Sequence, residues 1–183
     1  SPGVGGVCLE KDPYILFHSA KSKNYSAILP LGAREISERM VTSVASGILN
    51  FLKKENKELN KAKVLVLGFA FKGRPVTSDV RGSTAAKLVT KLKAAKVKNI
   101  WVYDPVVKES DVTSHGAKHT KDIKEAFSKA DAVVVMNNNP AFENLDIRKL
   151  LALSNNSSFL FDTWGLYKKE EIEKVKGAIY KRL

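Results

Sequence analysis

The only cysteine in the sequence, Cys8, follows a glycine-rich segment near the start of the chain. Three glycines in the five residues before it allow unusual dihedral angles and close approach of the backbone to a ligand. The first helix, which we expect to begin at Asp12 and Pro13, would direct backbone N–H groups towards the sulfur, and Lys11 adds positive charge. These surroundings favour a thiolate, although a lone cysteine is more often a small buried apolar residue. Cys8 is therefore a candidate nucleophile, and its surroundings alone indicate no substrate.

The chain carries a large net positive charge, which could indicate an anionic partner or ligand. The 183 residues include 31 basic and 19 acidic side chains, a formal net charge of +12. Such a balance can indicate a nucleic-acid-binding protein, which gains affinity by releasing counterions from phosphates. The lysines are dispersed, however, and no zinc finger, recognition helix or aromatic-interleaved basic motif accompanies them. We therefore expect no nucleic-acid partner, since a nucleoside diphosphate would explain part of the charge equally well.

Composition also limits the class of protein. With 44% hydrophobic and 27% charged residues, the sequence is typical of a globular protein with room for one complete domain and part of another. One cysteine and three histidines make disulfides and a metal site unexpected. Without a long apolar run or a recognisable signal peptide, we expect a cytoplasmic protein with no membrane partner. The sequence does not begin with Met, and we expect it to start part-way through a longer polypeptide.

The first third of the chain predicts helices. We expect a short helix from Tyr14 to about Lys23 and a longer one from about Gly32 to Glu55. The longer segment places apolar residues every four positions, which gives it a wide apolar stripe. The charge-rich segment 53–63 then predicts a helix end and a linker, so the domain boundary is expected near residue 60.

From residue 61 the pattern changes to alternating strands and helices. Bounded apolar runs predict four buried strands, at 64–69, 100–104, 131–136 and 158–162. Helices are expected between and after them, at 84–95, 121–129, 145–153 and 168–181. The order is typical of an α/β fold: a doubly wound, mostly parallel Rossmann-like domain over 61–183, preceded by a helical segment over 1–60.

Two common nucleotide-binding motifs are incomplete or absent in residues 61–183. Gly68 and Gly73 have the spacing of a P-loop, but Arg74 and Pro75 replace the required Lys and Ser/Thr, which excludes a P-loop kinase. No Gly-x-Gly-x-x-Gly follows the first strand, so residues 61–183 are not an obvious NAD-binding domain.

Three segments resemble motifs of the UDP-glucose/GDP-mannose dehydrogenase family, in the family's order and spacing. The family's active-site segment, Gly-x-Gly-Gly-x-Cys followed four residues later by Asp, is similar to GVGGVCLEKD at residues 3–12. A family strand end, with Phe-Lys, an acidic residue and Arg before a helix, resembles LGFAFKGRPVTSDVRGS at residues 67–83. A weaker third match is VYDP at residues 102–105. The resemblance therefore covers almost the whole chain.

The resemblance implies an NAD-dependent enzyme that oxidises the C6 alcohol of a nucleotide sugar to a carboxylate in two hydride transfers. The intermediate aldehyde must gain a nucleophile before it can lose a second hydride. The Cys8 thiolate would add to the aldehyde and form a thiohemiacetal. Oxidation of the thiohemiacetal would give a thioester, which water hydrolyses. Asp12 would help to activate the water and handle protons. A plain helix N-cap is the simpler interpretation of Asp12, and the two roles can coexist.

The same resemblance implies the binding residues. Lys72 would point into the crevice at the carboxyl end of the sheet, and Arg81 would reach towards NAD across a domain boundary. Without the flanking motif, Lys72 would be a solvated loop lysine and Arg81 a surface arginine near a helix start. The residues expected to bind the UDP-sugar substrate are Gly3, Val4, Gly5, Phe71 and Lys72.

The resemblance also implies that UDP and NAD bind to different domains. Residues 61–183 would bind UDP, whereas NAD would bind on an N-terminal domain that is absent from this sequence. The family's catalytic lysine and asparagine lie upstream as well, so residues 1–183 alone are not expected to turn over. Residues 1–60 would carry the active-site loop and form a homodimer, which we prefer to the alternative that the apolar stripe packs within the chain.

The sequence departs from the family pattern at two positions that affect the substrate. Many relatives have His or Ser where this chain has Val7, and Asp-x-Arg where it has Asp162, Thr163 and Trp164. The segment CLEKDP favours a UDP-N-acetylhexosamine, with ManNAc or GlcNAc, over UDP-glucose. A UDP-glucose 6-dehydrogenase and a nucleotide-binding α/β module without chemistry of its own remain as alternatives.

Overall fold

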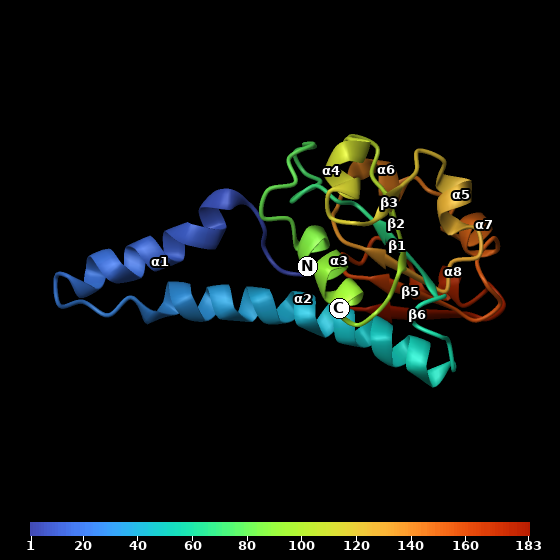
Figure 1. Ribbon diagram of the computed structural model, residues 1–183, viewed down its shortest axis with the longest axis horizontal. Helices are drawn as coiled ribbons and strands as arrows, with labels where there is room; N and C mark the ends of the chain where they lie inside the picture. The colour runs from blue at the N-terminus through green and yellow to red at the C-terminus, as the bar shows by residue number, and fades with distance from the viewer.

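The computed structural model describes residues 1–183 and shows a long helical pair that extends from an α/β body (Figure 1). Helix α1 (Val7–Lys21) and helix α2 (Ile28–Lys54) pack against each other and form the protruding arm at the left of the view. The second half of α2 runs along the body, where it packs against α3 (Thr84–Ala94) and β5 (Ser158–Asp162). One helix therefore belongs to both parts.

The body is built on a six-stranded sheet in which every pairing is parallel. The strand order is β3-β2-β1-β4-β5-β6, so the chain moves outwards from β1 in one direction and then returns to continue from β4 in the other. The remaining strands are β1 (Lys63–Leu67), β2 (Asn99–Tyr103), β3 (Lys118–His119), β4 (Ala132–Val135) and β6 (Ala178–Arg182). This arrangement confirms the predicted doubly wound Rossmann-like fold, with its topological switch point between β1 and β4.

Two apolar layers cover the sheet because side chains along each strand alternate between its faces. Val64 and Val66 of β1 face a cluster with α2 and α3, whereas Leu65 and Leu67 face a second cluster on the opposite side. The second layer includes side chains from four short helices, α5 (Ile123–Phe127), α6 (Pro140–Glu143), α7 (Ile147–Leu151) and α8 (Lys169–Ile172). A further short helix, α4 (Glu109–Thr113), precedes β3. Burial on both faces explains why β1, β4 and β5 are continuous apolar runs.

The predicted closing helix at 168–181 is wrong. Only α8 is helical there, and the chain then forms β6, which pairs in parallel with β5 over five residues. Tyr180 on β6 donates its hydroxyl to Asp162 at 3.1 Å and to the carbonyl of Tyr167 at 3.0 Å. Residues 178–182 thus gain more from pairing with the free edge of β5 than from continuing a helix. Local helix propensity is weak compared with tertiary contacts.

Both helices of the arm begin earlier than predicted. Helix α2 starts at Ile28 because Pro30 lies in its first turn, where a backbone N–H has no partner within the helix. Helix α1 starts at Val7 and contains Pro13, which was expected to mark its beginning. The carbonyl of Leu9, which Pro13 leaves without its helical donor, accepts a hydrogen bond from Arg34. None of the helices is both long enough and apolar enough to cross a bilayer.

Candidate functional site

The glycine-rich segment runs between α2 and the loop that follows β1. On one side, Gly3 lies against Ser37 of α2, and the backbone N–H of Val4 donates to the Ser37 hydroxyl at 2.7 Å. On the other side, the Gly6 N–H donates to the Gly82 carbonyl at 3.2 Å. The segment is therefore tied to the helical arm and to the body within four residues.

Two of its glycines are required by this close approach. A Cβ on Gly5 would collide with the carbonyl oxygen of Gly82. Gly6 has φ of 101°, which L side chains rarely adopt, and a Cβ there would lie 3.1 Å from the ring of Phe71. The structure thus brings Gly5, from the start of the chain, together with Phe71, as expected for one site.

Cys8 is the second residue of α1, and its side chain is exposed. It lies within the first turn of the helix and not upstream of a helix start at Asp12, which corrects the predicted arrangement. Gly6 is the N-cap and provides no side-chain acceptor, so the N–H groups of the first turn remain available to an anion. Cys8 is therefore closer to this helix end than the sequence indicated.

Asp12 lies one helical turn after Cys8, on the same face of α1, and is not the N-cap that its sequence position predicted. Its carboxylate accepts a hydrogen bond from Lys11 Nζ at 2.6 Å, and about half of its side chain is exposed. That hydrogen bond and charge raise the pKa of Lys11, to which Cys8 adds a smaller effect. A carboxylate near the thiol, with access to solvent, could hold or move a proton.

Arg81 reaches the same region from the end of the loop after β1. Its guanidinium binds both carboxylate oxygens of Asp79, at 3.0 and 2.7 Å, and its side chain is 74% exposed. The hydrogen bonds from Arg81 lower the pKa of Asp79 to about 2. Asp79 in turn raises the pKa of Arg81, and Cys8 makes a smaller contribution in the same direction.

A hollow of about 400 Å³ opens beside Arg81, at the start of α3. Glu10 and Lys87 line its wall, and His115 closes one side. The exposed guanidinium gives this hollow a cation that could hold an anionic cofactor group. No group of three or more His, Cys, Asp or Glu side chains is arranged to hold a metal ion.

Lys72 is half-buried on the loop after β1, and its ammonium lies 5.1 Å from the centre of the Phe71 ring. It forms no ion pair with an acidic side chain of this chain. The loop begins at the carboxyl end of β1, beside the topological switch point, where open α/β sheets bind ligands. Its free ammonium group is therefore placed to meet an anion such as a diphosphate.

The sequence did not reveal how this loop is held. Asp104 is buried at the end of β2 and accepts hydrogen bonds from the backbone N–H groups of Phe69 and Ala70, at 2.7 and 3.2 Å, and of two residues in its own loop. After β4, Asn138 accepts from the Gly73 N–H at 3.3 Å. The signal was present, since the Asp of VYDP and the asparagines at 137–139 directly follow apolar strands.

The loop after β5 is held by a buried carboxylate, Asp162. Asp162 is buried and accepts hydrogen bonds from the backbone N–H groups of Gly165 and Tyr167, at 2.8 and 2.9 Å. Burial, together with the Asp162 charge, raises the pKa of Tyr180 to about 12. Trp164 packs against the second apolar cluster, and Arg182 of β6 lies against Gly165. An arginine thus reaches this loop from a different strand.

Comparisons with known proteins agree with these motifs. Residues 65–169 match the UDP-binding domain of the UDP-glucose/GDP-mannose dehydrogenase family. The UDP-N-acetyl-D-mannosamine dehydrogenase of Pyrococcus horikoshii is 35% identical over 144 residues, which are 79% of this chain and 31% of that protein. The UDP-glucose 6-dehydrogenase of Rhizobium meliloti is 28% identical over 181 residues, 94% of this chain and 38% of that protein.

Solved structures give the same result for the fold. The structure of the Pyrococcus horikoshii UDP-D-ManNAc dehydrogenase superposes with a TM-score of 0.78 at 31% identity, over 98% of this chain and 38% of that one. An NDP-N-acetyl-D-galactosaminuronic acid dehydrogenase from Methanosarcina mazei superposes with a TM-score of 0.82, and its 24% identity supports the fold alone. The chain spans between 31% and 39% of the length of the curated relatives it matches.

Proposed function

The chain belongs to the UDP-glucose/GDP-mannose dehydrogenase family, and we propose that it is the C-terminal portion of an NAD-dependent UDP-sugar 6-dehydrogenase. In this proposal residues 61–183 bind the UDP part of the substrate, with Phe71 and Lys72 at the switch point. Residues 1–60 carry the reactive thiol, and a further domain of the whole protein binds NAD. The free ammonium of Lys72 and the match of residues 65–169 to a UDP-binding domain support this division.

The proposed chemistry is a four-electron oxidation of a C6 alcohol to a carboxylate. NAD, when bound, accepts one hydride in each of the two oxidation steps. Between them, the Cys8 thiolate adds to the aldehyde carbon to give a thiohemiacetal, whose oxidation leaves a thioester. Asp12 takes a proton from the water that attacks this thioester, which releases the acid and the thiol. Arg81 holds an anionic group of the cofactor beside Cys8.

The observation that carries the proposal is the junction of the glycine-rich segment with the body. The Gly6 N–H bonds the Gly82 carbonyl, and Gly5 packs so closely that no side chain fits. Arg81 immediately precedes this contact, and Cys8 begins the helix that leaves it. Thiol, arginine and UDP-binding loop are thereby held in one region although they are separated by more than sixty positions in the sequence.

We propose a UDP-N-acetylhexosamine as the substrate. Several relatives bear the name UDP-N-acetyl-D-mannosamine dehydrogenase, including those of Pyrococcus horikoshii and Methanocaldococcus jannaschii. UDP-glucose is the alternative, and a panel of UDP-sugars assayed with the whole enzyme decides between them. A cytoplasmic location, where such sugars would meet NAD, remains a prediction.

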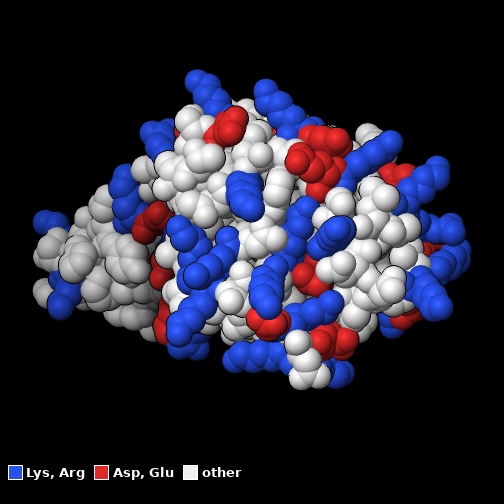
Figure 2. Space-filling model, turned by 45° about the vertical axis from the view of Figure 1, so that its right-hand side comes forward, with Lys and Arg blue, Asp and Glu red and all other residues white.

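We further propose that the arm forms a homodimer. No residue of α1 is buried, and a set of large apolar side chains along both helices is exposed: Leu9, Tyr14, Ile15, Leu16, Ile28, Leu29 and Ile36. The arm, at the left of Figure 2, shows few charged side chains, whereas Lys and Arg are spread over the body with Asp and Glu between them. An exposed apolar surface of this kind favours burial against another protein surface.

The stoichiometry of NADH tests the proposed reaction. The enzyme that contains this chain should release two NADH for each UDP-sugar, and Cys8→Ser should abolish acid formation because the aldehyde then has no thiolate to receive it. Ser19→Ala, at an exposed position further along the same helix, is the control and should keep two NADH per sugar. Sustained acid production by Cys8→Ser would contradict the assigned role.

A further inference from the structure

The helix that carries Cys8 contains a proline that ought to weaken it. Residue i+4 of an α-helix normally donates its N–H to the carbonyl of residue i. Pro13 has no N–H, so the carbonyl of Leu9, directly after Cys8, lacks this donor. An unpaired carbonyl in the first turn would loosen the segment that the thiol depends on.

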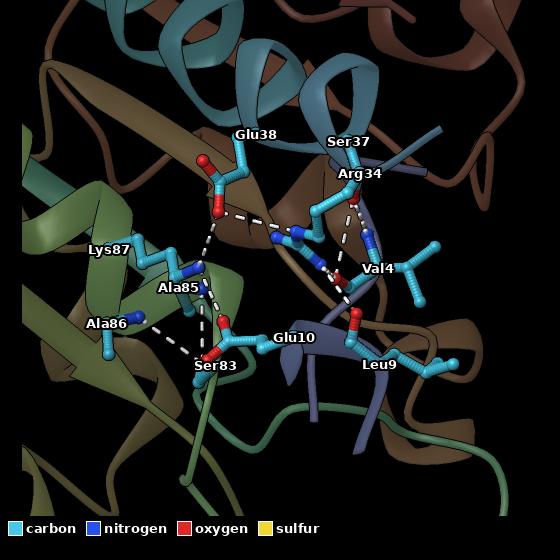
Figure 3. A network of polar contacts seen from close by, with 10 residues as sticks. All are labelled: Val4, Leu9, Glu10, Arg34, Ser37, Glu38, Ser83, Ala85, Ala86 and Lys87. Carbon is cyan, nitrogen blue, oxygen red and sulfur yellow. Dashed lines mark hydrogen bonds and ion pairs between the residues drawn. The ribbon is translucent and has the colours of Figure 1, made fainter. Parts of the chain in front are cut away.

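Arg34 of α2 provides the missing donor. Its Nη1 lies 3.5 Å from the Leu9 carbonyl oxygen and 3.0 Å from that of Val4 (Figure 3). Its Nε donates to Glu38, one turn further along α2, at 3.3 Å. One guanidinium therefore bonds the backbone on both sides of Cys8, four residues before it and one after it.

The Arg34 side chain is buried, which is unusual for a charged residue on this arm. Only 4% of Arg34 is exposed, although it lies on an arm whose other helix has no buried residue. Placing a cation out of water is costly unless hydrogen bonds and a counter-charge compensate for it. An apolar side chain would pack here without that cost but could not bond the two carbonyls.

The same contact network continues to the UDP-binding body. Glu38 lies 3.7 Å from Lys87 of α3, and Lys87 also pairs with Glu10, two residues after Cys8, at 2.5 Å. Figure 3 shows these groups converging from three helices. The position of the first turn of α1 is therefore fixed relative to α2 and α3 together.

We propose that Arg34 is a positioning residue that holds the Cys8 thiol in its reactive place. The assignment rests on the proposed function, because Arg34 has a positioning role only if Cys8 is the nucleophile. Arg34 touches the backbone on either side of Cys8 and not the reacting atoms. Its contacts with the Val4 and Leu9 carbonyls keep the first turn of α1, which carries Cys8, in place against α2.

Alkylation with iodoacetamide tests this on the chain itself, because Cys8 is its only cysteine. Cys8 is already exposed, so loosening the helix cannot raise reagent access much. We expect Arg34→Ala to slow alkylation at pH 7 about threefold, the size of a helix-end effect. Arg39→Ala is the matched control, because that arginine lies on the same helix with 76% of its side chain exposed.

The whole enzyme gives a second readout. Arg34→Ala should lower kcat about tenfold or more, since misplaced groups lose much of the benefit of orientation. KM for the UDP-sugar should change less than kcat, because Phe71 and Lys72 lie on the body and only the contacts of the glycine-rich segment would be disturbed. Pro13→Ala restores an N–H opposite the Leu9 carbonyl and should recover part of the loss in the Arg34→Ala background, but should change little alone.

Equal alkylation rates in the wild type, Arg34→Ala and Arg39→Ala would overturn the assignment. If circular dichroism shows that Arg34→Ala does not fold, Arg34→Lys with and without Pro13→Ala makes the same comparison, because lysine keeps the charge without the planar fork. Identical rates in that pair and the wild type would overturn it too. Acid formation by Cys8→Ser would instead contradict the proposed function, whatever Arg34 does to alkylation.

Discussion

The body and the arm of this molecule are held together by different forces. The body encloses two apolar clusters around a parallel sheet, and its central strands are buried on both faces. In the arm, α1 buries no residue, and the only buried residue of α2 before Val41 is the charged Arg34. The comparison teaches that the body has a sufficient core of its own, whereas the arm depends on polar contacts at its base and on whatever covers its apolar side chains.

The largest expected effect sharpens this contrast through stability. Phe161 is fully buried between the sheet and α2, where a Cβ on Gly47 would lie 2.8 Å from its ring. Phe161→Ala should lower the free energy of unfolding by about 3–5 kcal/mol, the usual result of emptying a core site. Leu16→Ala on α1 is the control and, at concentrations where the chain is monomeric, should change it by less than about 0.5 kcal/mol. Urea unfolding measures both, and similar losses would contradict the contrast.

A smaller effect is expected on association. Leu16→Asp places a charge on the exposed apolar surface of the arm, so it should weaken dimerisation about tenfold or more, or about 1.4 kcal/mol. The stability of the body should not change. Sedimentation equilibrium of the wild type and the variant tests this. A dimer that tolerates the charge would show that the arm is not the interface.

The smallest effect concerns Asp79 and Arg81 at the junction of the two parts. The carboxyl pKa of Asp79 in the folded chain, about 2, lies below its ordinary value of about 3.9. A depressed pKa stabilises the folded state above about pH 4, and this contribution is lost as the pH falls towards 2. The stability difference between the wild type and Asp79→Asn should therefore shrink over that window. Because Arg81 is largely exposed, the difference should be small, and salt should reduce it further.

The sequence predicted the body better than the arm, and for a physical reason. Strands β1, β4 and β5 are continuous apolar runs, a pattern that few other structures produce. Strand β6 was missed because its residues are mostly exposed and only its pairing with β5 makes it a strand. The two-residue strand β3 and the short helices α4 and α6 are too short to show a period.

The candidate site divides in the same way. The motifs around Cys8, Phe71 and Arg81 were recognised, and the structure places their segments together. The extent of α1 could not be predicted, because the donor that replaces the missing N–H of Pro13 lies twenty-one positions away, at Arg34. An arginine on an amphipathic helix normally faces solvent, so no local signal marked Arg34 as buried. Asp104 was noticed within a motif, but its four backbone contacts depend on the fold.

The most direct test of the central claim is protection of Cys8 by a nucleotide sugar, because it asks whether body and arm form one site. Saturating UDP-N-acetylmannosamine should slow alkylation of the single thiol in the wild-type chain, UDP alone should slow it less, and uridine should have no effect. In Lys72→Ala, higher concentrations should be needed for the same protection. Binding of the nucleotide sugar with no change in the rate of alkylation, or no binding at all, would contradict the account.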